Sequence, residues 1–75
     1  MKELLQKMIQ FKQVTIELVE ALKLDEVNKL DNLLDSRQMV IECMEKLQYT
    51  NEEFINICNE LHILNIQNEL LLSFR

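Results

Sequence analysis

Arg37 is the residue of this chain whose type and position most strongly suggest chemistry. It lies in a segment with apolar residues at every third or fourth position, and its neighbours three and four residues away are Leu33, Leu34, Val40 and Ile41. No carboxylate on the same helix is therefore placed to pair with it. Three interpretations remain open. The stem packs on the core while the guanidinium reaches solvent, the guanidinium meets a carboxylate or amide of another helix at a register or interface position, or it binds a ligand.

The other reactive residues form no recognisable catalytic or metal site. Cys43 and Cys58 are not spaced as a CxxC pair, and the single histidine, His62, is expected at the surface. The simplest interpretation of the cysteines is two small buried hydrophobic residues, with a redox pair as the alternative. Glu52 and Glu53 are explained by the start of a helix. We therefore expect no catalytic residue, no metal and no cofactor.

The composition excludes several classes of function. The chain has 75 residues with no glycine and no proline, so the glycine-rich loops of nucleotide-binding sites and nucleophile elbows cannot be built. Its formal net charge is −5, and its eight Lys and Arg residues form no stripe, which argues against binding to nucleic acid or to an anionic membrane. No apolar run is long enough to span a membrane, and we expect a cytoplasmic protein with reduced thiols.

The apolar pattern predicts a single all-α domain of three antiparallel helices, at about residues 2–22, 25–48 and 51–74. The spacing of threes and fours in the second helix is typical of bundles and coiled coils. Asp25 is expected to cap the N-terminus of that helix. Because so short a chain has a small core, we expect the three-helix bundle to be completed by self-association, as a dimer, or by a partner helix.

The third helix has the clearest start signal in the sequence. Thr50 to Glu53 form a capping box, and Tyr49 and Phe54 are placed as the hydrophobic staple around it. A tight turn at this point would make the second and third helices an antiparallel hairpin. It would bring together four pairs of residues: Leu47 with Phe54, Met44 with Ile57, Cys43 with Cys58, and Val40 with Leu61.

The expected third helix is apolar on two opposite sides. One side suits the hairpin and carries Phe54, Ile57, Cys58, Leu61, Leu64 and Leu71. Asn65 and Asn68 fall on this side too, where they would set the register between helices. The other side carries Ile63, Ile66, Leu70 and Phe74. An exposed apolar face normally marks an interaction site, so we expect it to bind a second copy, a partner or a missing C-terminal helix.

The segment Leu30–Ile41 resembles the "LxxLLxxRxxLI" signature of small helical flagellar export chaperones of the FliT type, with Arg37 as the most telling match. The stretch Leu64–Leu70 and the apolar N-terminal helix resemble them too. The resemblance implies a cytoplasmic chaperone that holds the flagellar filament-cap protein by its amphipathic C-terminal helix until secretion. This chain is shorter than most members and has no clear fourth helix after Arg75.

The same segment also resembles the first helix of the all-helical chorismate mutases, with the pattern "IDxLLxLLxxR". Those enzymes need several basic side chains that converge on a dicarboxylate substrate. Here Arg37 is the one basic residue on an apolar face. We therefore expect a helix-binding chaperone or adaptor, with a self-associating structural protein that has no client as the alternative, and no enzyme.

Overall fold

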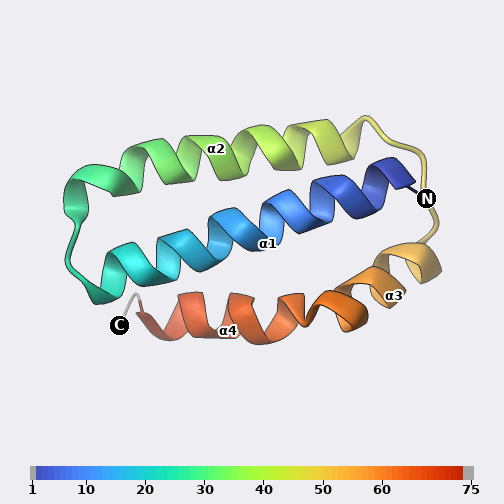
Figure 1. Ribbon diagram of the computed structural model, residues 1–75. Coiled ribbons are helices and arrows are strands. Elements are labelled where there is room, and N and C mark those ends of the chain that lie inside the picture. Colours follow the sequence, from blue (N-terminus) through green and yellow to red (C-terminus); the bar gives the residue numbers. More distant parts are fainter. Residues whose placement is uncertain (1, 74–75) are drawn as a thin grey trace.

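The structure, a computed structural model, describes residues 2–73. These residues form four α-helices and no strand: α1 (Lys2–Lys23), α2 (Val27–Glu45), α3 (Asn51–Leu61) and α4 (Ile63–Ser73). The expected all-α class is therefore confirmed. Helix α1 lies between the others, with α2 antiparallel to it on one side and α3 and α4 running parallel to it on the other (Figure 1).

Helix α1 is the centre of the fold because it is apolar over about half its circumference. Leu4, Met8 and Leu18 are at most 1% exposed. Thr15 is equally buried, and its hydroxyl donates a hydrogen bond to the carbonyl of Phe11 at 2.8 Å, which satisfies this buried polar side chain. An apolar surface this wide accommodates two neighbours rather than one.

The core has two parts, one at each end of α1. Near the start of α1 the buried side chains come from α1, α2, α3 and α4: Leu4, Met8, Met44, Ile57, Cys58 and Ile63. Near its end they come from α1 and α4, namely Leu18, Val19 and Leu70, with Leu30 and Leu33 of α2 packed against them. Helix α1 thus takes part in both, and it holds α2 and α4 in place.

The turn from α1 to α2 is a Schellman motif. Asp25 has a φ of 57°, its N–H donates to the carbonyl of Leu22, and the N–H of Glu26 donates to the carbonyl of Ala21. Asp25 therefore terminates α1, and the expectation that it caps α2 is wrong. The N-cap of α2 is Glu26, whose side chain makes no capping hydrogen bond. In a chain without glycine, an aspartate takes the left-handed position at lower steric cost than most residues.

The start of α3 agrees with its sequence signal in the N-cap and the staple, but the Glu53 side chain does not form the second hydrogen bond of the capping box, and its Oε2 is buried without a partner. Thr50 is the N-cap, and its hydroxyl accepts a hydrogen bond from the N–H of Glu53 at 3.1 Å. The rings of Tyr49 and Phe54 stack with their centroids 5.9 Å apart, as the hydrophobic staple requires. These contacts fix the direction in which the chain enters α3.

The predicted continuous helix over residues 51–74 is interrupted at His62. This residue caps α3 with a φ of 56°, and its N–H donates to the carbonyls of Cys58 and Asn59. Helix α4 begins at the next residue, Ile63. A left-handed residue breaks the helical phase, so the side chains of α4 point in different directions from those that a continuous helix would give.

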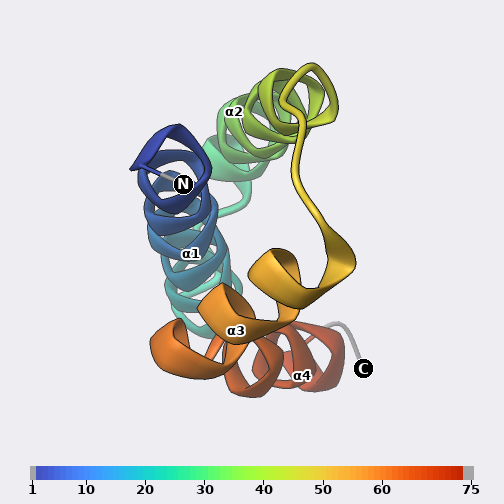
Figure 2. The same cartoon turned by 90° about the vertical axis from the view of Figure 1, so that its right-hand side faces the viewer.

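Helices α2 and α3 do not form the expected hairpin. Within residues 2–73, no Cα of α2 lies within 8 Å of a Cα of α3 or α4. Helix α2 also ends at Glu45 instead of residue 48, in a tight last turn in which the N–H of Leu47 donates to the carbonyl of Met44. The segment that follows crosses the space between α2 and α3 (Figure 2). Side chains of α2 and α3 meet in the core, but the two backbones remain apart.

No helix in residues 2–73 combines the length and the apolar content needed to cross a bilayer.

Candidate binding groove

An apolar pocket opens where α2 and α3 diverge. Its base consists of Met8 and Phe11 of α1, and its volume is about 320 Å³. The walls come from α2, from the loop before α3, and from α3 and the start of α4: Ile41, Met44, Glu45, Tyr49, Phe54, Cys58 and Ile63. Seen along the helices, α2 and α3–α4 lie on the same side of α1 and apart from each other (Figure 2).

The wall formed by α2 carries exposed apolar residues beyond this pocket. Ile41 lines the pocket, and Leu34 and Val27 lie seven and fourteen residues before it, so all three are on one side of the helix. Leu34 is 43% exposed and Val27 is 64% exposed. Helix α2 thus presents an apolar stripe that α1 does not cover.

The wall formed by α4 has a matching stripe. Gln67 accepts a hydrogen bond from Arg37 of α2. This contact identifies the side of α4 that faces the opening. Leu64 and Leu71 lie three residues before and four residues after Gln67, on the same side of the helix. They are 62% and 58% exposed. We call the pocket together with these two stripes the groove.

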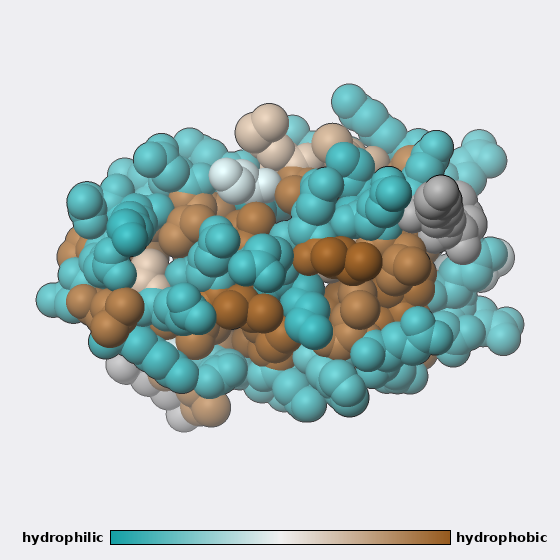
Figure 3. All heavy atoms as spheres, viewed as in Figure 1, coloured by the Kyte–Doolittle hydropathy of each residue, from teal (hydrophilic) through white to brown (hydrophobic). Residues whose placement is uncertain are grey.

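The face of the molecule seen in Figure 3 is different. Apolar atoms on it lie in patches that are broken by hydrophilic side chains. Isolated exposed apolar residues are normal on protein surfaces. The regular stripes on α2 and α4 are therefore the more informative surface.

Arg37 connects the two walls of the groove. Its guanidinium lies over the ring of Phe11, with the central carbon 4.7 Å from the ring centroid. Its Nη2 donates a hydrogen bond to Oε1 of Gln67 at 3.0 Å, which links α2 to α4 across α1. Of the three interpretations of Arg37, the cross-helix contact with an amide is the one that this geometry matches.

Within the described residues, Arg37 lacks a hydrogen-bond partner for its Nε and a carboxylate to balance its charge. The side chain is half-buried, and its Nε is buried without a hydrogen-bond partner. Burial lowers the pKa of the guanidinium from its usual value. The ion pairs found among residues 2–73 join Lys23 to Glu69 and Lys29 to Glu26, and neither involves Arg37. The guanidinium is therefore partly desolvated with a neutral amide and an aromatic ring as its partners.

The prediction that one face of the last helix is exposed for partner binding is wrong. Ile63 and Leu70 are 7% and 4% exposed because they pack on α1, and Ile66 is half-buried. Phe74, the fourth residue of that face, lies outside the described residues. The cause is the break at His62, which turns this side of α4 toward α1 and turns Leu64 and Leu71 outward.

The two asparagines do not occupy the expected register positions. Asn65 and Asn68 are both exposed, so they lie outside the packed contacts between helices. Their side of α4 would have faced α2 in a continuous hairpin, but α4 instead packs on α1. The polar residue of α4 that reaches α2 is Gln67, which no pattern in the sequence distinguished.

The two cysteines are not equivalent, and the expected pairing of them is wrong. Cys58 is 9% exposed at the edge of the groove, and its burial raises the pKa of the thiol. Cys43 is exposed on another side of α2, where it lines a shallow depression with Lys7 and Gln10 of α1. The expectation of two buried residues therefore holds for Cys58 and fails for Cys43.

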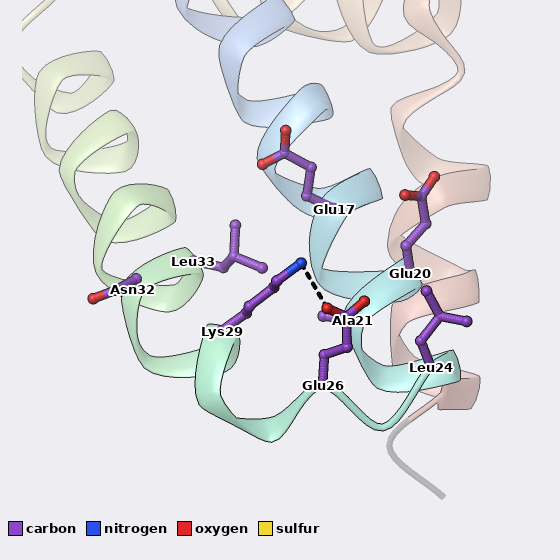
Figure 4. A pocket seen from close by; sticks show the side chains of 8 residues that line it. All are labelled: Glu17, Glu20, Ala21, Leu24, Glu26, Lys29, Asn32 and Leu33. Atoms are coloured by element: carbon purple, nitrogen blue, oxygen red, sulfur yellow. Dashed lines mark ion pairs between the residues drawn. The ribbon is translucent and has the colours of Figure 1, made fainter.

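A second pocket, of about 370 Å³, lies beside the turn between α1 and α2. The Lys29 ammonium is turned toward Glu26 at 2.6 Å, while the side chains of Glu17 and Glu20 point away from that ion pair (Figure 4). The hydrogen bond to Glu26 raises the pKa of Lys29. Residues 2–73 contain no group of His, Cys, Asp and Glu arranged to hold a metal ion. The carboxylates do not converge, so this pocket offers no acid–base chemistry.

Comparisons with known proteins add no family to these observations. No family model, no curated protein and no solved structure matches the chain.

Proposed function

We propose that the protein binds an amphipathic helix of another protein in the groove between α2 and α3–α4. The observation that carries this proposal is the pair of exposed apolar stripes on the two walls, with Leu34 on α2 and Leu64 and Leu71 on α4. The walls have no backbone contact with each other within the described helices. An apolar surface in this arrangement is stabilised when something covers it.

The shape of the groove favours a helix as the occupant. In a four-helix bundle each helix has two neighbours, and α1 has α2 on one side and α3–α4 on the other. A helix in the fourth position would contact both walls and would complete the bundle. The seven-residue spacing of the stripes matches the spacing at which an amphipathic helix presents its own apolar residues.

The wider proposal follows the resemblance to export chaperones of the FliT type. In it the protein acts in the cytoplasm by binding alone, without catalysis, cofactor, nucleic acid or membrane insertion, and its client is a secreted protein such as a flagellar filament-cap protein. The positions of the signature residues support this proposal. Leu30 and Leu33 pack toward the core, Leu34 is exposed on the groove side, and Arg37 joins its own helix α2 to α4.

A matched pair of double variants tests the location of binding. The groove variant is Leu34→Glu with Leu64→Glu, and the outer variant is Met39→Glu with Leu72→Glu. Each variant replaces one exposed apolar residue on α2 and one on α4, and each changes the charge by the same amount. Met39 lines the outer depression beside Cys43, and Leu72 lies on the side of α4 opposite Leu70.

The probe is a fluorescent synthetic peptide of about three heptads with leucine at the a and d positions and alternating Glu and Lys outside. Its anisotropy should rise with the wild type and with the outer variant, and it should change little with the groove variant. A peptide of the same composition with scattered leucines serves as the control. Circular dichroism should give the same helix content for all three proteins. Equal binding by both variants would contradict the proposal.

Self-association is the competing function, because a second copy would also cover the stripes. Sedimentation of the wild type without peptide separates the two. A monomer that binds the peptide supports the client-binding proposal. A stable dimer that the groove variant abolishes and that the peptide does not displace supports a self-associating structural protein.

A further inference from the structure

We propose that Arg37 makes the groove selective for a helix that carries a carboxylate within its apolar face. This inference rests on the proposed function, because it concerns the chemistry of the helix that would occupy the groove. It assigns Arg37 a role in specificity in addition to its contact between the walls.

Within residues 2–73, Arg37 has no counter-ion, because neither ion pair of these residues involves it. A guanidinium has five N–H donors, and here one of its nitrogens donates to the Gln67 amide while Nε is buried without a partner. The Phe11 ring supplies a cation–π contact at 4.7 Å but no negative charge. A carboxylate is the group that a partly buried guanidinium binds most strongly.

Three carboxylates of the neighbouring helices α1 and α4 have other surroundings, and Glu45 of α2 lines the groove pocket without an ion pair to Arg37. Glu69, two residues from Gln67, pairs with Lys23 of α1 at 2.8 Å. Glu17 and Glu20 of α1 line the pocket beside the α1–α2 turn, where Figure 4 shows them. Within the described residues, the charge of Arg37 is therefore unpaired and available to a carboxylate of a bound helix.

Arg37 also lies among apolar residues. On α2, Leu34 lies three residues before it and Ile41 four residues after it. On α4, Leu64 lies three residues before the amide that Arg37 contacts. A bound helix would thus meet apolar residues at both ends and a cation near its middle. One polar position within an apolar seam fixes the register of packed helices, so a central carboxylate would also fix the position of the bound helix.

Three versions of the synthetic peptide test this inference, with Glu, Gln or Leu at one central d position. With the wild type, the Glu peptide should bind about tenfold more tightly than the Gln peptide, a difference of about 1.4 kcal/mol. The Arg37→Met variant should lose this preference and bind the Leu peptide best. Arg37→Lys should keep a reduced preference, because it retains the charge without the planar fork.

The Gln67→Glu variant gives the matched control within the groove. The introduced carboxylate pairs with Arg37 inside the chain, so the preference for the Glu peptide should disappear while the Leu peptide still binds. Circular dichroism of each variant confirms that it is folded. If the wild type binds the Glu and Gln peptides equally, the role of Arg37 is overturned and the groove proposal stands. If the wild type binds none of the three peptides, the groove proposal itself fails.

Discussion

Two stripes of α4 are one residue apart in the sequence and lie in opposite environments. Ile63 and Leu70 are 7% and 4% exposed, whereas Leu64 and Leu71 are 62% and 58% exposed. All four are large aliphatic residues, so hydrophobicity does not explain the difference. The first stripe packs on α1, and the second faces the side on which α2 stays more than 8 Å away between Cα atoms.

Helix α2 repeats the contrast on the opposite wall. Leu33 packs against the core at the end of α1, while its neighbour Leu34 is 43% exposed. Leu34, Leu64 and Leu71 therefore lie beside the same opening, while Met39 and Leu72 are exposed on the outer side of the same two helices. Helix α1 thus covers one side of each wall, and a second apolar stripe on each wall remains exposed on the side of the groove.

The largest expected effect is the difference between Leu70→Ala and Leu71→Ala. Leu70→Ala removes a buried side chain and leaves a cavity between α1 and α4, so it should lower the free energy of unfolding by about 2–5 kcal/mol. Leu71→Ala should change it by less than about 0.5 kcal/mol, because the side chain is mostly in water already. Urea denaturation followed by circular dichroism measures both. Equal losses would mean that the second stripe is also part of the core.

The next effect concerns Gln67→Glu, which fills the missing charge between the two walls. A charge-assisted hydrogen bond to Arg37 replaces a weaker one to the amide, and we expect a gain of about 1 kcal/mol at neutral pH after the desolvation of the new carboxylate. The gain should appear as a higher urea midpoint. No gain would indicate that the Arg37 charge is already well solvated.

The pH dependence of this gain has a defined sign. The nearby guanidinium would hold the pKa of the introduced carboxyl below the value of about 4.3 that it has in an unfolded chain. The added stability is therefore present above about pH 4.3 and is lost as the pH falls through the lower pKa of the folded state. The wild-type amide does not titrate, so the difference between the two proteins isolates this effect. A gain that persists at pH 2 would have another cause.

A smaller effect is expected at His62, which determines the stripe of α4 that meets α1. Because its φ is 56°, His62→Gly should raise the free energy of unfolding by about 0.5–1 kcal/mol, and His62→Ala should lower it by a similar amount. Denaturation curves of the two variants test this. A stabilising His62→Ala would indicate that a continuous helix is the preferred form and that the two stripes can exchange places.

The break at His62 also explains how far the sequence alone can be interpreted. The helical class, the start of α3 at Thr50 and the stack of Tyr49 on Phe54 follow from local signals, because capping and hydrophobic staples involve residues close in sequence. The orientation of α4 does not follow from local signals. An apolar pattern that changes sides between Leu61 and Ile63 has two explanations, a helix that is buried on both sides or a change of helical phase. The sequence gives no glycine to indicate the second.

The location of the candidate site depends on whether the helix is continuous or changes phase at His62. Arg37 was identified from its lack of a partner on its own helix, which is a local property. Its contacts with Phe11 and Gln67 come from two other helices, and the positions of those helices follow from packing on α1. The apolar pattern predicts the exposed stripe on Ile63, Ile66, Leu70 and Phe74. In the structure the exposed stripe is formed by Leu64 and Leu71, because one left-handed residue determines which stripe faces α1.

The smallest expected effect is a change in thiol reactivity, which reports on the groove without altering it. Cys43 is exposed, whereas Cys58 is 9% exposed and has a raised thiol pKa, so iodoacetamide should alkylate Cys43 first at pH 8.

Cys58 lines the groove and Cys43 lies on another side of α2. A bound amphipathic peptide should therefore slow the alkylation of Cys58 and leave Cys43 unaffected, as measured by mass spectrometry of digests. The Cys43→Ser variant allows the slower reaction to be followed by itself. Equal protection of both thiols would mean that the peptide stabilises the whole fold or binds elsewhere, since a helix in the groove covers one side of α2 alone.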